Sequence, residues 1–322
     1  MTVPSNTYLR YTTVGAREDL SDVIYDISPT DTPIMSSIGK SKATATYHEW
    51  QTDKLAAPNT SNAAIEGDDA AAASMSPTVR YGNFTQIVQK TIQVSGTLEA
   101  VDKAGRKSEK AYQLTRASQE LKRDIEAIIT SNQAATNGTA TSGARKMSSL
   151  LSWIKTNTNK GAGTTTGGGD PTTIGVSVRT DADTTRTFTE AILKDVVQQI
   201  FTEGGKPVAL YVPPALKQTV SAFAGIAAQR YVTGAEATTI IGAADVYLSD
   251  FGMLSIVPNR FMRTRDALFL DPEYAALSYL RPFTTNELAK TGDSDKTQII
   301  AELTLEVRNE AAHGGAFDLN AA

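Results

Sequence analysis

Few side chains in this sequence are of a type that could carry catalysis or bind a metal. The 322 residues include no cysteine and only two histidines, His48 and His313, which excludes thiolate nucleophiles and cysteine-ligated zinc. His48 falls in a predicted strand and His313 in the sequence AAHGG near the end of the chain, and no partners for a catalytic triad can be assigned to either. We therefore predict no catalytic residue, no metal site and no cofactor.

Two further patterns resemble ligand-binding motifs but lack essential positions. A calcium loop needs a glycine at its sixth position and a glutamate at its twelfth, and neither run that begins with a pair of aspartates has them. These pairs are Asp181 with Asp183 and Asp293 with Asp295. The glycine cluster at 161–169 lacks both the third glycine of a dinucleotide fingerprint and the Lys-Ser/Thr of a phosphate loop. We interpret all of them as turns and loops.

Composition narrows the class of protein. Thirty-one basic and 35 acidic residues give a net charge of -4, so a dedicated nucleic-acid-binding protein is not expected. The first residues lack the basic start and apolar block of a secretory signal, and no apolar run approaches the roughly 20 residues of a membrane span. With 40% hydrophobic residues the chain can bury a core, so we predict a folded protein with no membrane partner.

The elements that must position any functional surface begin with an arm and a ribbon. Residues 1–40 contain three prolines and read as an arm. Two segments rich in β-branched and aromatic residues, 43–51 and 79–95, predict strands. Between them, residues 52–78 are mostly Ala, Ser, Asn and Thr, and their charged residues are Asp53, Lys54, Glu66, Asp68 and Asp69. This connection is acidic and has almost nothing to form a core.

Such a ribbon is longer than loops in compact domains usually are, and an isolated two-stranded ribbon is only marginally stable in water. Its strands carry the aromatic side chains Tyr47, Trp50, Tyr81 and Phe84. Aromatic side chains favour docking on another surface, and in a homomeric assembly that surface belongs to another copy of the chain.

A long helix is predicted from Lys107 to Asn137, because this stretch has no glycine or proline and its apolar residues recur on one face. The residues of that face are Leu114, Leu121, Ile125 and Ile128. Two oppositely charged pairs four residues apart, Arg116 with Glu120 and Lys122 with Glu126, are expected on the solvent-exposed face. The Thr- and Gly-rich segment 156–170 that follows is predicted to be a surface loop.

The second half has the pattern of a packed α/β unit. A helix beginning near Phe188 should end at Gly204 and Gly205, followed by a strand over 207–214 and a helix from about Ala215. Two short strands are expected within 244–260, and DALFLDPEYAALSYL follows at 266–280. The strongest strand, 298–309, alternates apolar and polar residues with a period of two.

The order of these parts resembles that of the major capsid proteins of tailed bacteriophages, which have the Hong Kong 97 type fold. More specific motifs support the resemblance: EGDDA (66–70), AGR followed by ELKRDIE (104–126), DVYLSDFGMLSIVPNR (245–260), LFLDPEYAALSYLRPF (268–283) and ELAKTGDSDK (287–296). The resemblance implies an α+β fold in five parts. These are an N-arm (1–40), an extended loop (41–97), a spine helix and peripheral domain with a variable loop (98–187), an axial domain (188–280), and a return strand of the peripheral domain with the C-terminus (281–322).

The same resemblance implies a structural protein rather than an enzyme. It implies self-assembly into pentamers and hexamers that form an icosahedral shell around double-stranded phage DNA, within a virion assembled in the host cytoplasm. Expected partners are other copies of the chain, a portal protein and possibly separate scaffolding and decoration proteins, with only weak non-specific contact with DNA. Two alternatives stay open, a bacterial nanocompartment shell of the encapsulin type and another self-assembling surface-layer protein.

Residues for the contacts between subunits can also be nominated. The acidic tip formed by Glu66, Asp68 and Asp69 is expected to meet a basic patch on another copy, for which Arg260, Arg263 and Arg265 are the candidates. Because Asp266 lies beside these arginines, ion pairing within the chain is an equally valid interpretation. Trp50, Tyr81 and Phe84 complete the set of predicted contact residues.

Overall fold

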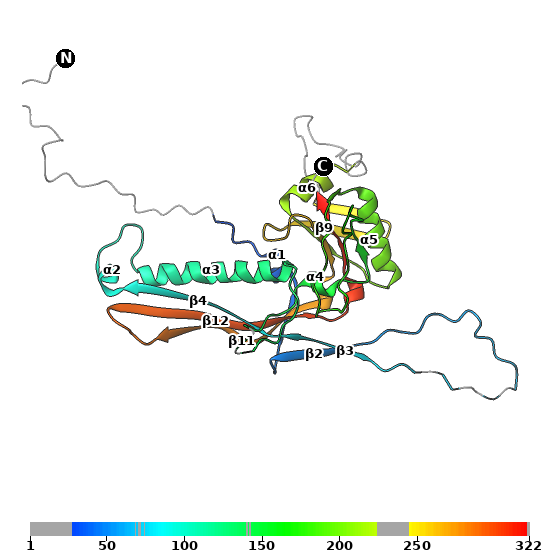
Figure 1. The fold of residues 1–322 in the computed structure, drawn as a ribbon, viewed down its shortest axis with the longest axis horizontal. Helices are drawn as coiled ribbons and strands as arrows, with labels where there is room; N and C mark the ends of the chain where they lie inside the picture. The colour runs from blue at the N-terminus through cyan, green and yellow to red at the C-terminus, as the bar shows by residue number, and fades with distance from the viewer. Residues whose placement is uncertain are drawn as a thin grey trace, which may run out of the picture.

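The computed structural model describes residues 28–67, 69, 72–73, 75–139, 141, 143–223 and 245–320. Most of the predicted N-arm and Asp68 of the acidic tip lie outside the described residues. A long helix lies along a sheet, an α/β unit stands at one end of this body, and an extended loop projects beyond it (Figure 1).

A four-stranded sheet supports the long helix. Its order is β1-β11-β12-β4, with β1 at Gly39–Lys42, β4 at Gln86–Ser95, β11 at Ala275–Leu288 and β12 at Ser294–Val307. The alternating residues of β12 behave as predicted on one face, where Ile299, Leu303 and Leu305 are buried in the core with the helix. The strand begins at Ser294 rather than 298, because β11 and β12 form one long antiparallel hairpin.

The long helix, α3, spans Glu109–Thr130 and is therefore shorter than predicted at its C-terminal end. Ser108 caps its start by accepting a hydrogen bond from the Ala111 amide. At the other end, the Ser131 hydroxyl donates to the Ile128 carbonyl and the backbone becomes extended. Short polar side chains after Thr130 offer the backbone hydrogen-bond partners other than the next helical turn, which ends the helix.

Glu126 was predicted to pair with Lys122 in solvent, and this is wrong. It is fully buried and accepts hydrogen bonds from the amides of Ile34 and Met35, 2.9 Å each, and from the Asn259 side chain at 2.7 Å. Its position beside Ile125 turns it toward the short helix α1 (Pro33–Ser37), whose first amides need acceptors. Burial raises the pKa of Glu126. The other predicted pair, Arg116 with Glu120, is present at 3.7 Å.

The extended loop starts from the antiparallel pair β2 (Tyr47–Thr52) and β3 (Val79–Phe84). The strand predicted over 79–95 is in fact two strands, because the chain changes partner at Thr85. β3 pairs with β2, whereas β4 pairs with β12. The segment between Thr52 and Val79 projects from the body as an open loop, and its described residues are exposed (Figure 1).

The α/β unit contains a six-stranded sheet in the order β5-β13-β10-β7-β9-β8. Its strands are β5 (Thr158–Asn159), β7 (Ala209–Val212), β8 (Val246–Ser249), β9 (Gly252–Pro258), β10 (Ala267–Leu270) and β13 (Gly314–Ala316). Helices α5 (Glu190–Thr202) and α6 (Pro214–Ser221) cover one face around a second apolar core. β5 and β13 come from segments outside 188–280, so parts of the chain before and after that range complete this sheet. The five-part division of the chain stays a prediction.

Shorter elements join these units. They are α2 (Gly96–Ala100), α4 (Leu150–Trp153), β6 (Arg186–Thr187) paired with β14 (Leu319–Asn320), and the 3-10 turns η2 (Pro272–Tyr274) and η3 (Glu310–Ala312). None of the helices in the described ranges is long and apolar enough to cross a membrane.

Gly204 ends α5 as predicted, with φ at +93°. Nothing lies within 4 Å of a Cβ placed there, so a substitution is opposed by backbone conformation alone. Gly204→Ala should lower the free energy of unfolding by about 1 kcal/mol. Chemical denaturation of the unassembled chain measures this, with Gly205→Ala as a comparison: its Cβ would lie 2.7 Å from Ile200, so steric overlap should add to its cost. Equal stability of Gly204→Ala and the unaltered chain would contradict the capping role.

Candidate assembly surfaces

Aromatic side chains fasten the root of the extended loop to the body of its own chain. Trp153 of α4 is 1% exposed, and its ring centroid lies 5.2 Å from that of Trp50 and 6.1 Å from that of Tyr81. Its indole N–H donates to the Ser148 hydroxyl at 2.6 Å. The ribbon was predicted to dock on another copy, whereas its root docks on Trp153 of its own chain, a residue that no sequence pattern singled out.

A second ring pair lies nearer the start of the hairpin. Tyr47 and Phe84 face each other across the β2–β3 pair with centroids 4.6 Å apart, and Tyr47 is 40% exposed. Trp50, Tyr81 and Phe84 therefore make contacts within the chain. Any additional contact of these three with a second copy stays a prediction.

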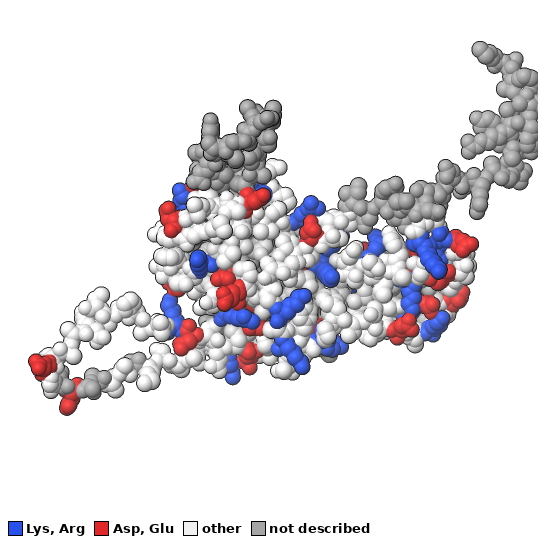
Figure 2. Space-filling view, turned by 180° about the vertical axis from the view of Figure 1, so that it is seen from behind, with Lys and Arg blue, Asp and Glu red and all other residues white. Residues whose placement is uncertain are grey.

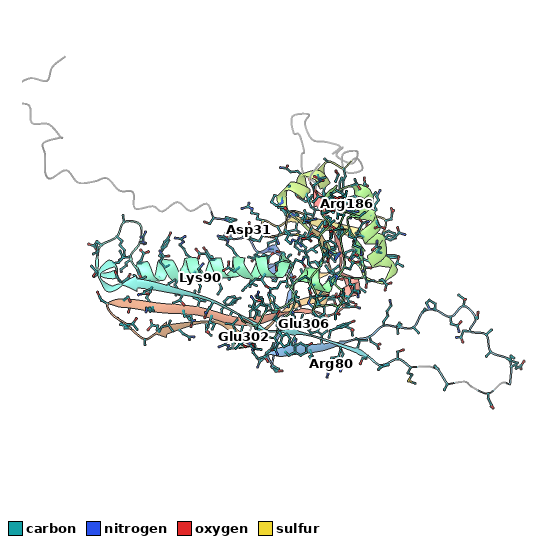
Figure 3. All side chains as sticks on the ribbon, viewed as in Figure 1. Asp31, Arg80, Lys90, Arg186, Glu302 and Glu306 are labelled. Carbon is teal, nitrogen blue, oxygen red and sulfur yellow. The ribbon has the colours of Figure 1, made fainter. Side chains whose placement is uncertain are left out.

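Two glutamates of β12 hold the same root to the four-stranded sheet. Glu302 accepts hydrogen bonds from the Thr85 hydroxyl at 2.8 Å, from Arg281 at 2.8 Å and from Arg145. Figure 3 shows Glu302 and Glu306 on β12, close to the β2–β3 pair. The polar face of β12 is thus buried under the hairpin. Glu302 links the root of the loop to Arg145, which precedes α4, and to Arg281 of β11.

Glu306 gathers a comparable set of partners. Burial opposes its ionisation, but hydrogen bonds from Ser41, Ser278, Arg308 and His48 outweigh this and lower its pKa. The His48 Nε2 lies 3.3 Å from Glu306 Oε2. Since the pKa is lowered, the stability that Glu306 contributes is present above its ordinary value and is lost as pH falls through the folded-state value.

Glu302→Gln should lower the free energy of unfolding by about 2 kcal/mol, because the change removes the charge that Arg145 and Arg281 share. Urea denaturation of the unassembled chain measures the loss. Glu287→Gln is the matched control, since Glu287 is mostly exposed and pairs with Lys110 at the surface, where little change is expected. Equal effects of the two variants would contradict the role of Glu302.

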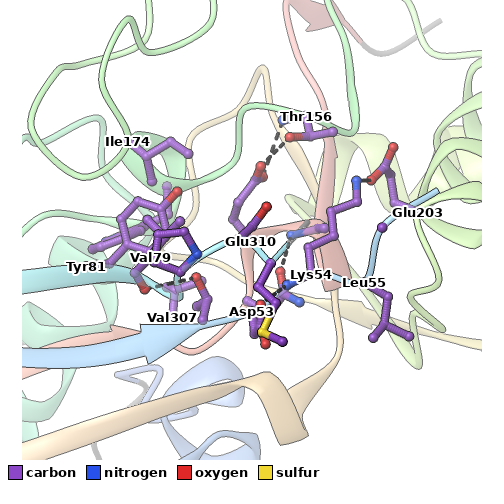
Figure 4. Close-up of a pocket in the computed structure, with 18 residues that line it drawn as sticks. Asp53, Lys54, Leu55, Val79, Tyr81, Thr156, Ile174, Glu203, Val307 and Glu310 are labelled. Carbon is purple, nitrogen blue, oxygen red and sulfur yellow. Dashed lines mark hydrogen bonds and ion pairs between the residues drawn. The ribbon is translucent and has the colours of Figure 1, made fainter. Parts of the chain in front are cut away.

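A groove of about 870 Å³ separates the first residues of the extended loop from the body (Figure 4). Lys54 bridges it by pairing with Glu203 at the end of α5, and Glu310 binds Thr156 on its other wall. Leu55 and Met75 line the groove from the loop side and are 91% and 92% exposed. Large apolar side chains with this exposure indicate a surface that a partner covers.

The acidic tip lies at the end of the extended loop, where Figure 2 shows red side chains far from the body. Glu66 and Asp69 are both exposed there. The structure thus presents these two carboxylates to the surroundings, and their predicted contact with another copy stays a prediction.

Two of the three arginines in the predicted basic patch form ion pairs within the chain. Arg263 pairs with Asp181 and, at 3.3 Å, with Asp266, while Arg265 pairs with Asp318 at 2.7 Å. These two arginines bind the 156–187 segment and the C-terminal segment to the turn before β10, so the alternative of ion pairing within the chain is the correct one for them. Only Arg260 of the three is exposed.

At the centre of this ion-pair cluster lies Asp266, which is fully buried. Neither of its carboxylate oxygens has a hydrogen-bond partner within the described residues. Burial raises its pKa to about 7, although Arg263, Arg179 and Arg265 oppose that shift. Arg179 itself is buried over the ring of Phe317 and pairs with Asp170. The segment predicted to be a plain surface loop is therefore held by buried charges.

Both histidines form hydrogen bonds within the fold, His48 with Glu306 and His313 with the Asp271 amide. Complete burial lowers the pKa of His313 to about 4, so it is neutral at pH 7 and accepts or donates hydrogen bonds within the fold. No group of three or more possible metal ligands occurs among the described residues. The aspartates at 181 and 183 instead bind arginine and loop backbone.

A spine-like helix on a sheet, an α/β unit at its end and a projecting loop are the arrangement of Hong Kong 97 type shell proteins. The capsid of a native GTA particle matches with a TM-score of 0.64 over 98% of this chain and 100% of that chain, at 10% identity. A Gordonia phage Cozz chain matches at 0.60 over 97% and 98%, also at 10% identity. The SrpI encapsulin of Synechococcus elongatus matches at 0.56 over 95% and 94%, again at 10% identity. These likenesses establish the fold.

The sequence carries the assignment further. The SU10 major capsid protein family matches residues 3–320, and the chain belongs to that family. The major capsid protein of Escherichia phage Phieco32 is 30% identical over 345 residues, which cover 96% of both chains. The chain is thus a phage major capsid protein, a component of the virion shell, from a structural family rather than an enzyme family.

Proposed function

We propose that this chain assembles into rings of five and six copies, which close into an icosahedral shell around double-stranded phage DNA. The observation that carries the proposal is the extended loop. Its root is fixed by Trp153 and Glu302, while Leu55 and Met75 beyond the root are almost fully exposed. A loop held this firmly at its base and left bare beyond it is suited to reach a neighbouring copy.

Many modest contacts can hold such a shell together. Each copy would bury limited surface against several neighbours, and closure of the rings makes the simultaneous loss of all contacts rare. The net charge of -4 suits a container, because tight binding of the phosphate backbone would hinder packing and release of DNA. Contact with DNA is then weak and non-specific.

Further partners belong to the same proposal. A portal protein would occupy one vertex of the shell, and separate scaffolding and decoration proteins would assist assembly in the host cytoplasm. No enzymatic role is proposed, because the chain belongs to a structural family rather than an enzyme family.

Sedimentation and negative-stain electron microscopy of the purified chain test the proposal. We expect closed particles of uniform diameter, formed by the chain alone or with the products of neighbouring genes. A chain that stays monomeric under all these conditions, or that forms only flat sheets or filaments, would overturn it. The encapsulin alternative shares the fold, and a packaged enzyme in place of DNA would favour it.

A further inference from the structure

Charged side chains from three distant segments meet at the turn before β10. On this turn, Arg263 pairs with Asp181. Arg265 donates hydrogen bonds to Asp318 and to the Ala182 carbonyl, at 2.7 Å each. Asp318 also accepts a hydrogen bond from the Ala182 amide at 2.9 Å. The turn thereby holds both the segment before β6 and the C-terminal segment that ends in β14.

A buried carboxylate lies among these pairs. Asp266 is fully buried, and the Arg263 Nη1 lies 3.3 Å from its Oδ2 without the geometry of a hydrogen bond. Arg179, which is 3% exposed, reaches the same place from the segment before β6 and donates to Asp170 at 2.5 Å. We call the whole set the ion-pair joint, and its members are Asp170, Arg179, Asp181, Arg263, Arg265, Asp266 and Asp318.

The joint has one carboxylate more than it has guanidinium groups. Its three arginines donate to the aspartates at 170, 181 and 318, whereas Asp266 accepts no hydrogen bond from any described residue. At the edge of the joint, Lys160 pairs with Asp170, and Arg186 donates to the Phe317 carbonyl at 3.3 Å. The charges of the joint itself therefore balance when Asp266 is protonated. An ionised carboxylate without hydrogen bonds is costly to bury.

Three N–H groups of the same arginines are buried and have no hydrogen-bond partner among the described residues. They are Nη1 of Arg179, Nη1 of Arg263 and Nε of Arg265. A guanidinium group is planar and its N–H groups have a fixed arrangement, so turning one of them toward a new acceptor moves the others. Arg263 therefore cannot direct its Nη1 at Asp266 without disturbing the bond from its Nη2 to Asp181.

We propose that the ion-pair joint is a lock controlled by one proton on Asp266. With the proton in place, the arginines stay on Asp170, Asp181 and Asp318 and hold the two segments to the turn. When the proton leaves to solvent, the ionised Asp266 draws Arg263 and its neighbours toward itself, and both segments loosen. The lock belongs to the single chain, so it goes beyond the proposed function and does not depend on shell formation.

The lock is closed at low pH and opens as the pH rises. Burial is the main cause that raises the pKa of Asp266 to about 7 from its ordinary value of 3.8, and Asp181 adds to the shift, whereas the three arginines oppose it. An acid whose pKa is raised in the fold contributes stability that is complete below the ordinary value. That contribution is lost as the pH rises through the folded-state value.

Enclosed water is the competing explanation of the unpartnered atoms, because buried waters commonly bind polar groups that no protein group satisfies. A water bonded to the oxygens of Asp266 would keep this side chain ionised without moving an arginine. The two segments would then be held equally tightly on both sides of neutral pH, which the experiment detects.

Amide hydrogen exchange of the whole, unassembled chain tests the lock at about pH 6 and about pH 8.5, with rates corrected for the intrinsic effect of pH on exchange. The Ala182 amide bonds to Asp318, and the Leu319 amide bonds to the Arg265 carbonyl. We expect the protection of peptides that contain these amides to fall about tenfold or more at the higher pH. The reference is β12, whose bonds to β4 and β11 involve no member of the joint.

Asp266→Asn is the variant that isolates the proton, because asparagine has the shape of protonated aspartate and does not titrate. Both segments of this variant should stay protected at both pH values. Asp245→Asn is the matched control, since the Asp245 side chain is 85% exposed, and it should lose protection as the unaltered chain does.

Three outcomes would overturn the inference. They are equal protection of the two segments at both pH values, a matching loss of protection in β12, and the same pH dependence in Asp266→Asn as in the unaltered chain. If Asp266→Asn does not fold, the comparison of the two segments with β12 in the unaltered chain decides alone.

Discussion

Replacing Trp153 by alanine should lower the free energy of unfolding by about 3–5 kcal/mol, because a large, fully buried side chain is lost and little can fill its space. Gly175 shows how closely the ring is packed, since a Cβ there would lie 2.8 Å from the Trp153 ring. The Trp50 and Tyr81 rings lose their platform in the same step. Guanidinium denaturation of the unassembled chain measures the loss.

The same variant should loosen the root of the extended loop. Proteolysis within residues 52–78 should then extend into β2 and β3, which the unaltered chain protects. Phe201→Ala is the control, because Phe201 is an aromatic side chain that is 53% exposed and packs on Phe251 rather than on Trp153. A loss of less than about 1 kcal/mol in Trp153→Ala would mean that the hairpin is held by other contacts.

Raising the pH should weaken the fold through Asp266. Its pKa is about 7 in the folded chain and has an ordinary value of 3.8, so between these values the folded chain holds a proton that the unfolded chain has released. The stabilising contribution is complete below about pH 4 and is lost as pH rises through about 7. A difference of this size corresponds to roughly 4 kcal/mol.

Asp266→Asn separates this contribution from those of other groups. Asparagine keeps the shape of the side chain but does not titrate, so its stability should fall less than that of the unaltered chain between pH 4 and pH 8. Urea denaturation at a series of pH values gives the difference between the two chains. Parallel stability curves would show that Asp266 is ionised in the fold throughout and that its arginine neighbours outweigh its burial.

Elements whose signal is local could be predicted from the sequence. The period of two in β12 and the glycine that ends α5 gave correct elements, because each depends on neighbouring residues alone. The break at Thr85 was missed, since both halves of 79–95 are good strand sequence and only the different partners of β3 and β4 separate them.

The contact residues were harder to predict, because burial of a polar residue depends on what the rest of the chain brings to it. Glu126 has an ordinary exposed-helix sequence context, yet α1 and Asn259 enclose it. In the sequence Arg263 and Arg265 resemble a basic surface, but in the fold they pair with Asp181 and Asp318, which come from distant segments. The alternation of Glu302 and Glu306 with apolar residues correctly predicted that they lie on the polar face of a strand. It did not indicate that the β2–β3 hairpin covers that face.

Cryo-electron microscopy of the assembled particle tests the central claim most directly, because it shows where residues 52–78 of each copy lie. We predict that the loop crosses to a neighbouring copy and that Glu66 and Asp69 lie against that copy. A loop that folds back on its own body, or that ends in solvent away from any other copy, would contradict it.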